Sequence, residues 1–288
     1  MNRTEKRMNP KFLLTLAPRT ILWIFLTGTA FLMLFPILMA FLGSFKTNLE
    51  VTAGATILPQ HWELVNYAKA WTHANFAKFT WNSIYLSVIT TVGTLIVTTM
   101  AAYAVDRVNF FGKKLYTAML ACTLFISIGA VVLRPQFDLM VALHLQKSLW
   151  GVILILISGH AAIFFMMIGF FKGIPRDLDE AALIDGCNFY SIYWRIILPL
   201  LRPALGVTGL FSFQGAWNEY ILPLVFTMSS PKLQTLTVGL AGLRYGIGAA
   251  AETQLMLAGA CLSILPLLVV YVFANKSFMQ VTVGAVKG

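Results

Sequence analysis

Long apolar runs alternate with short polar segments along most of this chain. The hydrocarbon core of a bilayer is about 30 Å thick and a helix rises about 1.5 Å per residue, so roughly 20 apolar residues cross it. The runs that are long enough predict spans at Ile21–Gly43, Ser83–Val105, Tyr116–Met140, Leu149–Phe171, Pro203–Thr227 and Gln254–Asn275. In the third run, Arg134 and Pro135 interrupt the outer part, which a bundle tolerates where neighbouring helices or water satisfy the freed carbonyl. The pattern predicts an all-α, polytopic membrane protein with six transmembrane helices.

The composition agrees with a membrane protein and argues against a nucleic-acid partner. Apolar residues make up 58% of the chain and charged residues 11%, which is about half the usual charged share of a soluble domain. The net charge of +10 comes from basic residues that cluster beside the apolar runs. Lysines and arginines in such positions fix a protein's orientation in a bilayer. The lipid bilayer, rather than a nucleic acid, is therefore the expected partner of this charge.

The same basic residues predict which ends of the spans face the cytoplasm. With the N-terminus inside, fourteen of the 21 lysines and arginines lie in cytoplasmic segments and seven in external ones. Cytoplasmic segments of membrane proteins carry the excess of basic residues, so both termini are expected in the cytoplasm. The apolar run from Ile21 is too long for a signal peptide and leads to no small-residue cleavage site. It is expected to remain as the first transmembrane helix.

No sequence pattern typical of an active site or a metal site occurs. Cys122 and Cys261 lie in predicted spans and Cys187 in a cytoplasmic loop, so no pair shares an oxidising compartment. The 4 histidines are scattered without metal-ligand spacing, and no Gly-x4-Gly-Lys-Ser/Thr phosphate loop is present. We therefore expect no enzymatic activity, no catalytic residue and no bound cofactor or metal ion in this chain.

A polar segment between the fourth and fifth predicted spans has an unusual density of charge. It contains Arg176, Asp177, Asp179, Glu180 and Asp185 within ten positions. Each of these charges would be costly in hydrocarbon, so the segment is expected to lie outside the bilayer.

Local rules predict two short helices in this segment. Carboxylates in the early turns favour the positive end of the helix dipole, and Gly186 is placed to end the first helix in a left-handed conformation. Asn188 is suited to cap a second helix, Phe189–Ile197, which Pro199 is expected to end. Two helices at an angle form a projection that fits a cleft on a soluble protein. The plain alternative is an ordinary capped loop.

The residue spacing within this segment resembles a known motif. Glu180–Ala182 is followed after three residues by Gly186, then after nine more by Ile196 and, one residue on, by Leu198–Pro199. This order is similar to the coupling-loop motif of the membrane subunits of ATP-binding-cassette importers. The resemblance implies that the segment docks into a groove of a cytoplasmic ATPase, with its small alanines leaving room for the partner. The residues implied in coupling are Glu180, Ala181, Ala182, Asp185, Gly186 and Pro199.

Further segments resemble carbohydrate importers of the maltose type, namely Asn82-Ser83, Ala101–Ala104, Ala216–Leu224 and Gly284–Gly288. The resemblance implies a type I importer permease fold in a bacterial or archaeal cell membrane. The implied partners are a second permease subunit, forming a heterodimer, a cytoplasmic ATPase dimer and an extracytoplasmic solute-binding protein.

The domain organisation that follows places the permease domain after a first helix and an external segment. The expected parts are a cytoplasmic N-terminus (1–20), a first transmembrane helix (21–43), an external interfacial segment (44–78), a permease domain (79–273, with the coupling loop at 172–202) and a cytoplasmic tail (274–288). The external segment contains Trp62, Tyr67 and Trp71, which suits the membrane interface. By its short length and weak charge the tail is expected to be a disordered end.

The fifth predicted span carries the residues best suited to contact a sugar. Phe211, Gln214 and Asn218 share one helical face at i, i+3 and i+7. An aromatic plane and amides suit a sugar, whose C–H faces stack on rings and whose hydroxyls need donors and acceptors. Glu219 lies beside them, and a carboxylate inside a span indicates function. With Trp217 these residues form the candidate substrate path; alternatively, Trp217 anchors the helix at the interface and the amides bond neighbouring helices.

These resemblances imply the permease subunit of an ATP-driven sugar importer, in which closure of the ATPase turns the path from inward-facing to outward-facing. One alternative is the same machine with glycerol phosphate or another polar cargo, which would require basic side chains in the path; the spans offer little beyond Arg134. A second is an ion-coupled secondary transporter, which needs an intramembrane ion site and preferably an inverted repeat, and neither is evident. A non-transporting scaffold would leave the loop motif unexplained.

The predicted orientation is tested by placing single cysteines at Lys113 and at Gln234 in a variant that lacks Cys122, Cys187 and Cys261. An impermeant thiol reagent added to intact cells is expected to label only the cysteine at Gln234, because Lys113 belongs to a cytoplasmic segment. Labelling at Lys113 from outside would overturn the orientation.

Overall fold

Helices make up almost all of the described chain. The computed structural model describes residues 10–54, 56–73, 75–125, 129–243 and 252–286. Within these ranges there is no β-strand, which confirms the predicted all-α class. The first elements are α1 (Pro10–Gly43), α2 (Asn48–Ala53), α3 (Val65–His73), α4 (Phe76–Arg107), α5 (Lys113–Phe125), η1 (Gly129–Val132), α6 (Leu133–Ala142), α7 (Leu149–Ser158) and α8 (Ala161–Phe171). They are followed by α9 (Asp177–Ile184), α10 (Phe189–Ile192), η2 (Tyr193–Ile197), α11 (Leu198–Leu200), α12 (Arg202–Asn218), α13 (Ile221–Thr227), η3 (Pro231–Leu233), α14 (Leu236–Leu243) and α15 (Thr253–Val286).

The described helices do not confirm the predicted number of spans. Three are long and apolar enough to cross a membrane, in α1, α4 and α15, and up to five if two bent helix pairs each count as one span. The bent pairs are α7 with α8, at 47°, and the helix Phe189–Leu200 with α12, at 78°. The predicted span Tyr116–Met140 is not one continuous α-helix, because α5 ends at Phe125 and the 3₁₀ turn η1 precedes α6. Its residues 126–128 lie outside the described ranges.

The predicted span Pro203–Thr227 is also broken, and a proline explains the break. α12 ends at Asn218, Glu219 adopts an extended backbone, and α13 begins at Ile221. In a continuous helix, residue 223 would donate its backbone N–H to the carbonyl of Glu219, but Pro223 has no N–H to donate. The carbonyl oxygen of Glu219 instead accepts a hydrogen bond of 2.8 Å from the hydroxyl of Thr237.

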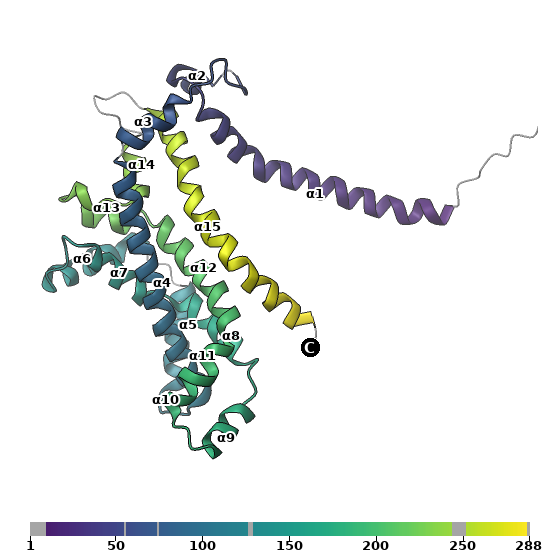
Figure 1. The fold of residues 1–288 in the computed structure, drawn as a ribbon, viewed down its shortest axis with the longest axis vertical. Coiled ribbons are helices and arrows are strands. Elements are labelled where there is room, and N and C mark those ends of the chain that lie inside the picture. Colours follow the sequence, from purple (N-terminus) through teal and green to yellow (C-terminus); the bar gives the residue numbers. More distant parts are fainter. Residues whose placement is uncertain (1–9, 55, 74, 126–128, 244–251, 287–288) are drawn as a thin grey trace, which may run out of the picture.

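Helix α4 lies at the centre of the bundle (Figure 1). It packs against α7, α8 and α12, and α12 packs in turn against α15. Near the start of α4, the side-chain amide of Asn82 donates to the carbonyls of Lys232 and Gln234, at 3.0 and 2.9 Å. The hydroxyl of Ser83 accepts the N–H of Leu236 at 2.8 Å. The Asn82-Ser83 pair therefore ties η3 and the start of α14 to α4.

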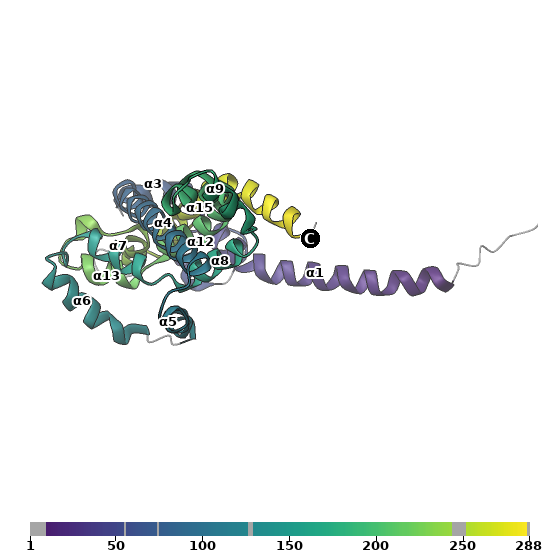
Figure 2. The same cartoon turned by 90° about the horizontal axis from the view of Figure 1, so that it is seen from below.

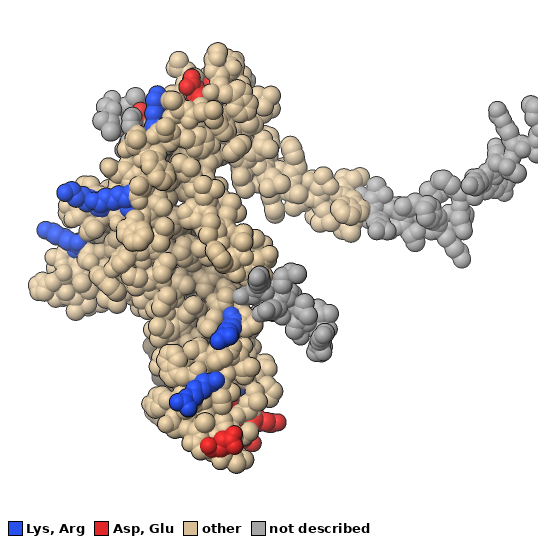
Figure 3. Space-filling view, in the orientation of Figure 1, with Lys and Arg blue, Asp and Glu red and all other residues tan. Residues whose placement is uncertain are grey.

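The elements α2 and α3 lie at one end of the molecule and α9 and α10 at the opposite end (Figure 1). Acidic side chains are visible at both of these ends in Figure 3. In the α2–α3 segment, Glu50 accepts the backbone N–H groups of Thr47 at 3.0 Å and Gln60 at 2.8 Å. These hydrogen bonds hold the pKa of Glu50 below its ordinary value. Trp62 and Trp71 are exposed there, as an interfacial location would require. That location stays a prediction.

Helix α1 projects away from the rest of the chain in both views (Figures 1 and 2). None of its most apolar stretch, within Ile21–Gly43, is buried inside the molecule. At the other end of the chain, α15 continues to Val286, so the expectation of a disordered tail is wrong for the described part of it. The helix that begins as an apolar span continues past Asn275, the predicted end of that span. The first nine residues, together with Lys287 and Gly288, lie outside the described ranges.

Candidate functional site

The polar segment predicted to form two short helices does so. α9 carries Asp177, Asp179 and Glu180 in its first turn, as expected for carboxylates at the positive end of the helix dipole. It ends before Gly186, whose φ of 83° confirms the left-handed conformation predicted there. A side chain with a Cβ is strained at that φ, although the space around Gly186 is open. We call residues 177–200, from the start of α9 to the end of α11, the knob.

The second helix of the knob begins as predicted but does not end as predicted. The side chain of Asn188 accepts the N–H of Ser191 at 2.8 Å and caps α10. The helix then widens into the π-helical turn η2, in which the N–H of Leu198 bonds to the carbonyl of Tyr193, and it continues through Pro199 to Leu200. The expectation that Pro199 ends this helix is therefore wrong. The π-helical turn comes just before the pyrrolidine ring of Pro199. In a normal α-helix the proline would leave the carbonyl four residues back without its hydrogen bond, and its ring would clash with that carbonyl.

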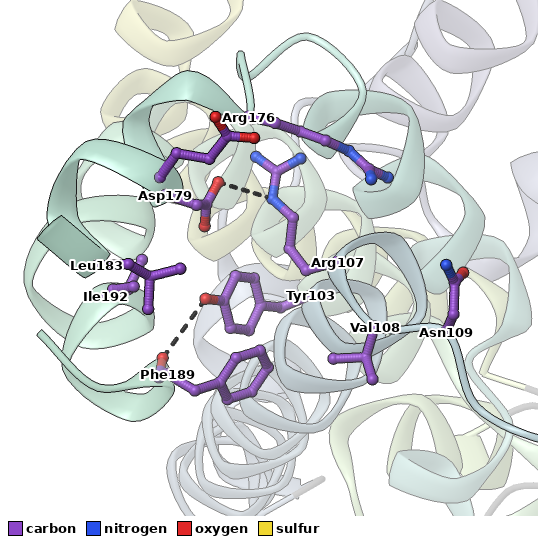
Figure 4. A pocket seen from close by; sticks show the side chains of 10 residues that line it. Tyr103, Arg107, Val108, Asn109, Arg176, Asp179, Leu183, Phe189 and Ile192 are labelled. Carbon is purple, nitrogen blue, oxygen red and sulfur yellow. Dashed lines mark hydrogen bonds and ion pairs between the residues drawn. The ribbon is translucent and has the colours of Figure 1, made fainter.

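An ion pair joins α9 to the end of α4 (Figure 4). The Nε of Arg107 lies 3.0 Å from a carboxylate oxygen of Asp179, and the two side chains are only 8% and 14% exposed. The same guanidinium is 2.8 Å from the carboxylate of Asp106 and donates to the carbonyl of Ile174 at 3.1 Å. Arg176 donates to the backbone carbonyl of Asp106 at 2.9 Å. The knob is thus held to the last turn of α4 by the ion pair, and the residues just before the knob are held there by hydrogen bonds.

Aromatic rings fasten the second helix of the knob to the same face of α4. The ring of Tyr103, one turn before Arg107, lies 4.6 Å from that of Phe189 and 5.2 Å from that of Tyr193. The hydroxyls of Tyr193 and Thr99 are 2.7 Å apart. Thr99, Tyr103 and Arg107 are spaced four residues apart, so they form one stripe along α4 that touches both helices of the knob.

The sequence motif alone did not indicate this stripe. Tyr103 falls within the short Ala101–Ala104 resemblance, but nothing in the sequence placed it against the knob. Arg107 is the last residue of α4. The one sequence signal for its role is its position four residues after Tyr103, which places the two side chains on the same helical face. Partners far apart in sequence become evident only once the chain is folded.

A groove of about 360 Å³ opens between the knob and the end of α4. Six of its lining residues are Tyr103, Arg107, Arg176, Asp179, Glu180 and Leu183. Among the predicted coupling residues, Glu180, Ala181, Asp185, Gly186 and Pro199 are exposed. Ala182 is 4% exposed and packs in the core between α8 and α10, so it does not offer the open surface that was expected of it. Its small side chain instead lets α9 approach the bundle closely.

The residues predicted for the substrate path divide between two sides of α12. Phe211, Gln214 and Asn218 are exposed on one face, and neither amide bonds to a residue within the described ranges. Trp217 is 2% exposed and stacks on Phe213 with ring centroids 5.7 Å apart, so it belongs to the core and not to that face. The carboxylate of Glu219 accepts the N–H of Leu222 at 3.2 Å and caps α13.

A family model described as a binding-protein-dependent transport system inner membrane component matches residues 7–277. The chain belongs to this family. Its apolar helices agree with the inner-membrane location that the description gives, and its relatives are permease components rather than enzymes.

Several transport proteins are similar to this chain over most of its length. The arabinooligosaccharides transport system permease protein of Bacillus subtilis is 32% identical, over 94% of this chain and 96% of its own length. The diacetylchitobiose uptake system permease protein of Streptomyces coelicolor is 31% identical, over 86% of this chain and 82% of its own. The galactooligosaccharides transport system permease protein of Bacillus subtilis is 30% identical, over 92% and 94%.

A solved structure shows the same fold. It is a chain of a bacterial ABC transporter involved in the import of the acidic polysaccharide alginate, with a TM-score of 0.71. The match covers 95% of this chain and 99% of that chain, at 24% sequence identity. The chain therefore has the permease fold of an ABC importer.

The left-handed bend at Gly186 can be tested by substitution. Gly186→Val is expected to cost about 1–2 kcal/mol locally, because a β-branched residue resists a positive φ, and to weaken association with the ATPase while the protein still inserts. Gly186→Asn is the matched control, since asparagine tolerates the left-handed region. Co-purification of the ATPase measures the effect. Equal recovery with the two variants would contradict the assignment.

Proposed function

We propose that this chain is the permease subunit of an ATP-driven sugar importer, forming half of the translocation path with a second permease subunit. The names of its relatives, which transport arabinooligosaccharides, diacetylchitobiose or galactooligosaccharides, support a sugar as the cargo. A cytoplasmic ATPase dimer and an external solute-binding protein complete the machine. Both termini and the knob lie in the cytoplasm, as the basic residues favour.

The observation that carries the coupling mechanism is the attachment of the knob to α4. The ATPase binds the exposed part of the knob, which includes Glu180, Ala181, Asp185 and Gly186. Because Arg107 joins α9 to the end of α4, movement of the ATPase-bound knob moves α4, the central helix of the bundle. α4 in turn packs against α7, α8 and α12. A shift of this helix then changes which side of the membrane the path opens to.

The exposed face of α12 lines that path and faces the second permease subunit. Phe211, Gln214 and Asn218 are exposed on the surface of this subunit, where a sugar or the facing subunit contacts them. Glycerol phosphate fits less well, because Arg134, the basic residue within the predicted spans, already pairs with Asp138 at 2.9 Å on the surface. The family of the chain does not fit an ion-coupled secondary transporter.

The coupling role of the ion pair is tested by Asp179→Asn. This change leaves Arg107 with Asp106 as a charged partner, so the fold is retained while the attachment of α9 weakens by about 1–3 kcal/mol. The reconstituted complex is expected to hydrolyse ATP while transporting several-fold less sugar per ATP. Asp177→Asn removes an exposed charge from the same turn and serves as the control. An unchanged ratio of sugar to ATP in Asp179→Asn would refute the role of the ion pair.

The α12 face is tested by Asn218→Ala and Gln214→Ala. If it lines the path, sugar uptake is expected to fall about fivefold for each hydrogen bond lost, at about 1 kcal/mol, with the yield of solubilised complex and basal ATP hydrolysis unchanged. If the amides bond the neighbouring subunit instead, yield falls in proportion to uptake. Unchanged uptake in both variants would remove these residues from the path.

A further inference from the structure

A second cavity lies where the span formed by α7 and α8 bends. The two helices meet at 47° across Gly159 and His160. Beside the bend, residues of α4, α8 and α12 enclose a space of about 370 Å³. This volume falls within the range of about 300–1,000 Å³ that is typical of small-molecule sites. Thr90, which lines it, lies about 20 Å along α4 from Phe76, near the middle of that helix.

Two buried hydroxyls that line this cavity have no hydrogen-bond partner in the described part of the chain. They belong to Thr90, which is fully buried, and Ser212, which is 4% exposed. The ring nitrogen Nδ1 of His160, which also lines the cavity, is likewise buried and unpartnered among these residues. The three groups come from α4, α12 and the α7–α8 bend, and they meet at one cavity.

Some other hydroxyls on the same helices are satisfied by the helix itself. Those of Thr91 and Thr98 donate to the carbonyls four residues back, each at 2.7 Å. That of Thr208 does so on α12, also at 2.7 Å. Ser87 and Thr94 of α4 are also buried without a partner among the described residues, but they do not line this cavity, whereas Thr90 and Ser212 do. A buried polar group without a partner is costly, so a ligand that bonds to both would recover that cost.

The remaining lining of the cavity selects the chemistry of such a ligand. Phe211 contributes an aromatic ring and Glu219 a carboxylate, and the described lining contains no lysine or arginine. Hydroxyls and an imidazole both donate and accept hydrogen bonds, whereas a carboxylate only accepts. Donors and acceptors beside an aromatic face suit the hydroxyl groups and C–H faces of a sugar ring. An anionic ligand would meet the Glu219 carboxylate with no basic side chain of this subunit to offset it.

The mouth of the cavity opens on the face of α12 that carries Phe211. Gly215, which lines it, is exposed, and a Cβ added there would meet no atom within 4 Å. Gly159 and Ala162 also line the cavity and are exposed. These small, exposed lining residues leave the entrance open toward the proposed path.

We propose that this cavity is a subsite for the hydroxyl groups of a neutral carbohydrate, bound by Thr90, Ser212 and His160. The proposal rests on the proposed function, because it assumes that a sugar passes along the α12 face. It assigns to this subunit a direct part in holding the cargo, and it adds residues of α4 and the α7–α8 bend to the sugar contacts.

The test compares hydroxyl-deleting variants in the complete, reconstituted importer. Thr90→Val combined with Ser212→Ala removes both hydroxyls with little change of shape, and Thr98→Val is the matched control because its hydroxyl is satisfied within α4. The probes are labelled arabino- and galacto-oligosaccharides, with an alginate oligosaccharide as an acidic competitor. The concentration for half-maximal uptake is expected to rise about tenfold or more in the double variant. The control and the yield of complex are expected to stay at the wild-type level.

A second variant closes the mouth without touching the hydroxyls. Gly215→Leu is expected to reduce uptake at unchanged yield, because its side chain extends into open space at the entrance. Gly169→Leu on α8, where an added Cβ also meets no atom within 4 Å, is the control. Wild-type uptake kinetics in both the double variant and Gly215→Leu would overturn the subsite, and so would a loss of yield in the double variant that matches its loss of uptake. Competition by the acidic oligosaccharide equal to that by neutral ones would overturn the neutral assignment.

Failure of the proposed function gives a different result. A wild-type complex that transports none of the sugars would refute the sugar cargo itself, and the subsite with it. A wild-type complex that transports a neutral sugar, with variants that do so equally well, would refute the subsite alone.

Discussion

The contact between Arg107 and Asp179 is the constraint on which the arrangement of the knob depends. A guanidinium at the end of α4 holds a carboxylate of α9 at 3.0 Å, and both side chains are largely shielded from solvent. The two terminal nitrogens of Arg107 bond to Asp106 and to the carbonyl of Ile174, so the charge is compensated as it leaves water. The knob would otherwise be a pair of short helices with little to orient them, since helices of this length are marginal alone.

Prolines and the hydrogen bonds around them set the shape of the rest of the chain. At Pro223 the missing N–H coincides with the end of the long helix α12, and the released carbonyl of Glu219 is satisfied by Thr237. At Pro199 the π-helical turn before the ring lets the helix continue. The result is a bundle in which broken helices leave a cavity beside α4 and α12, while α4 itself is one continuous helix from Phe76 to Arg107.

Local features of the knob were predictable from the sequence, and long-range ones were not. Gly186 and Asn188 act through their own backbone geometry and nearest neighbours, so a positive φ and a helix cap could be expected from residue type. The effect of Pro199 depended on whether the helix would widen before it, and that of Pro223 on a hydroxyl from another element. Ala181 and Ala182 look equivalent in the sequence, yet one is exposed and the other is in the core. The length of the apolar runs predicted the spans in α1, α4 and α15, but it could not show where an apolar run would break.

The proposed coupling requires the knob and α4 to move as one body when the ATPase closes. Spin labels at Leu183 in α9 and at Ile96 in α4, both at exposed positions, report the distance between the two elements. The measurement is made by pulsed electron paramagnetic resonance on the reconstituted importer, without nucleotide and with ATP trapped by vanadate. The account predicts the same distance distribution in both states for the wild type, and a broadened one for Asp179→Asn. A clear shift of the wild-type distance between the two states would show that the knob moves independently of α4 and would contradict the account.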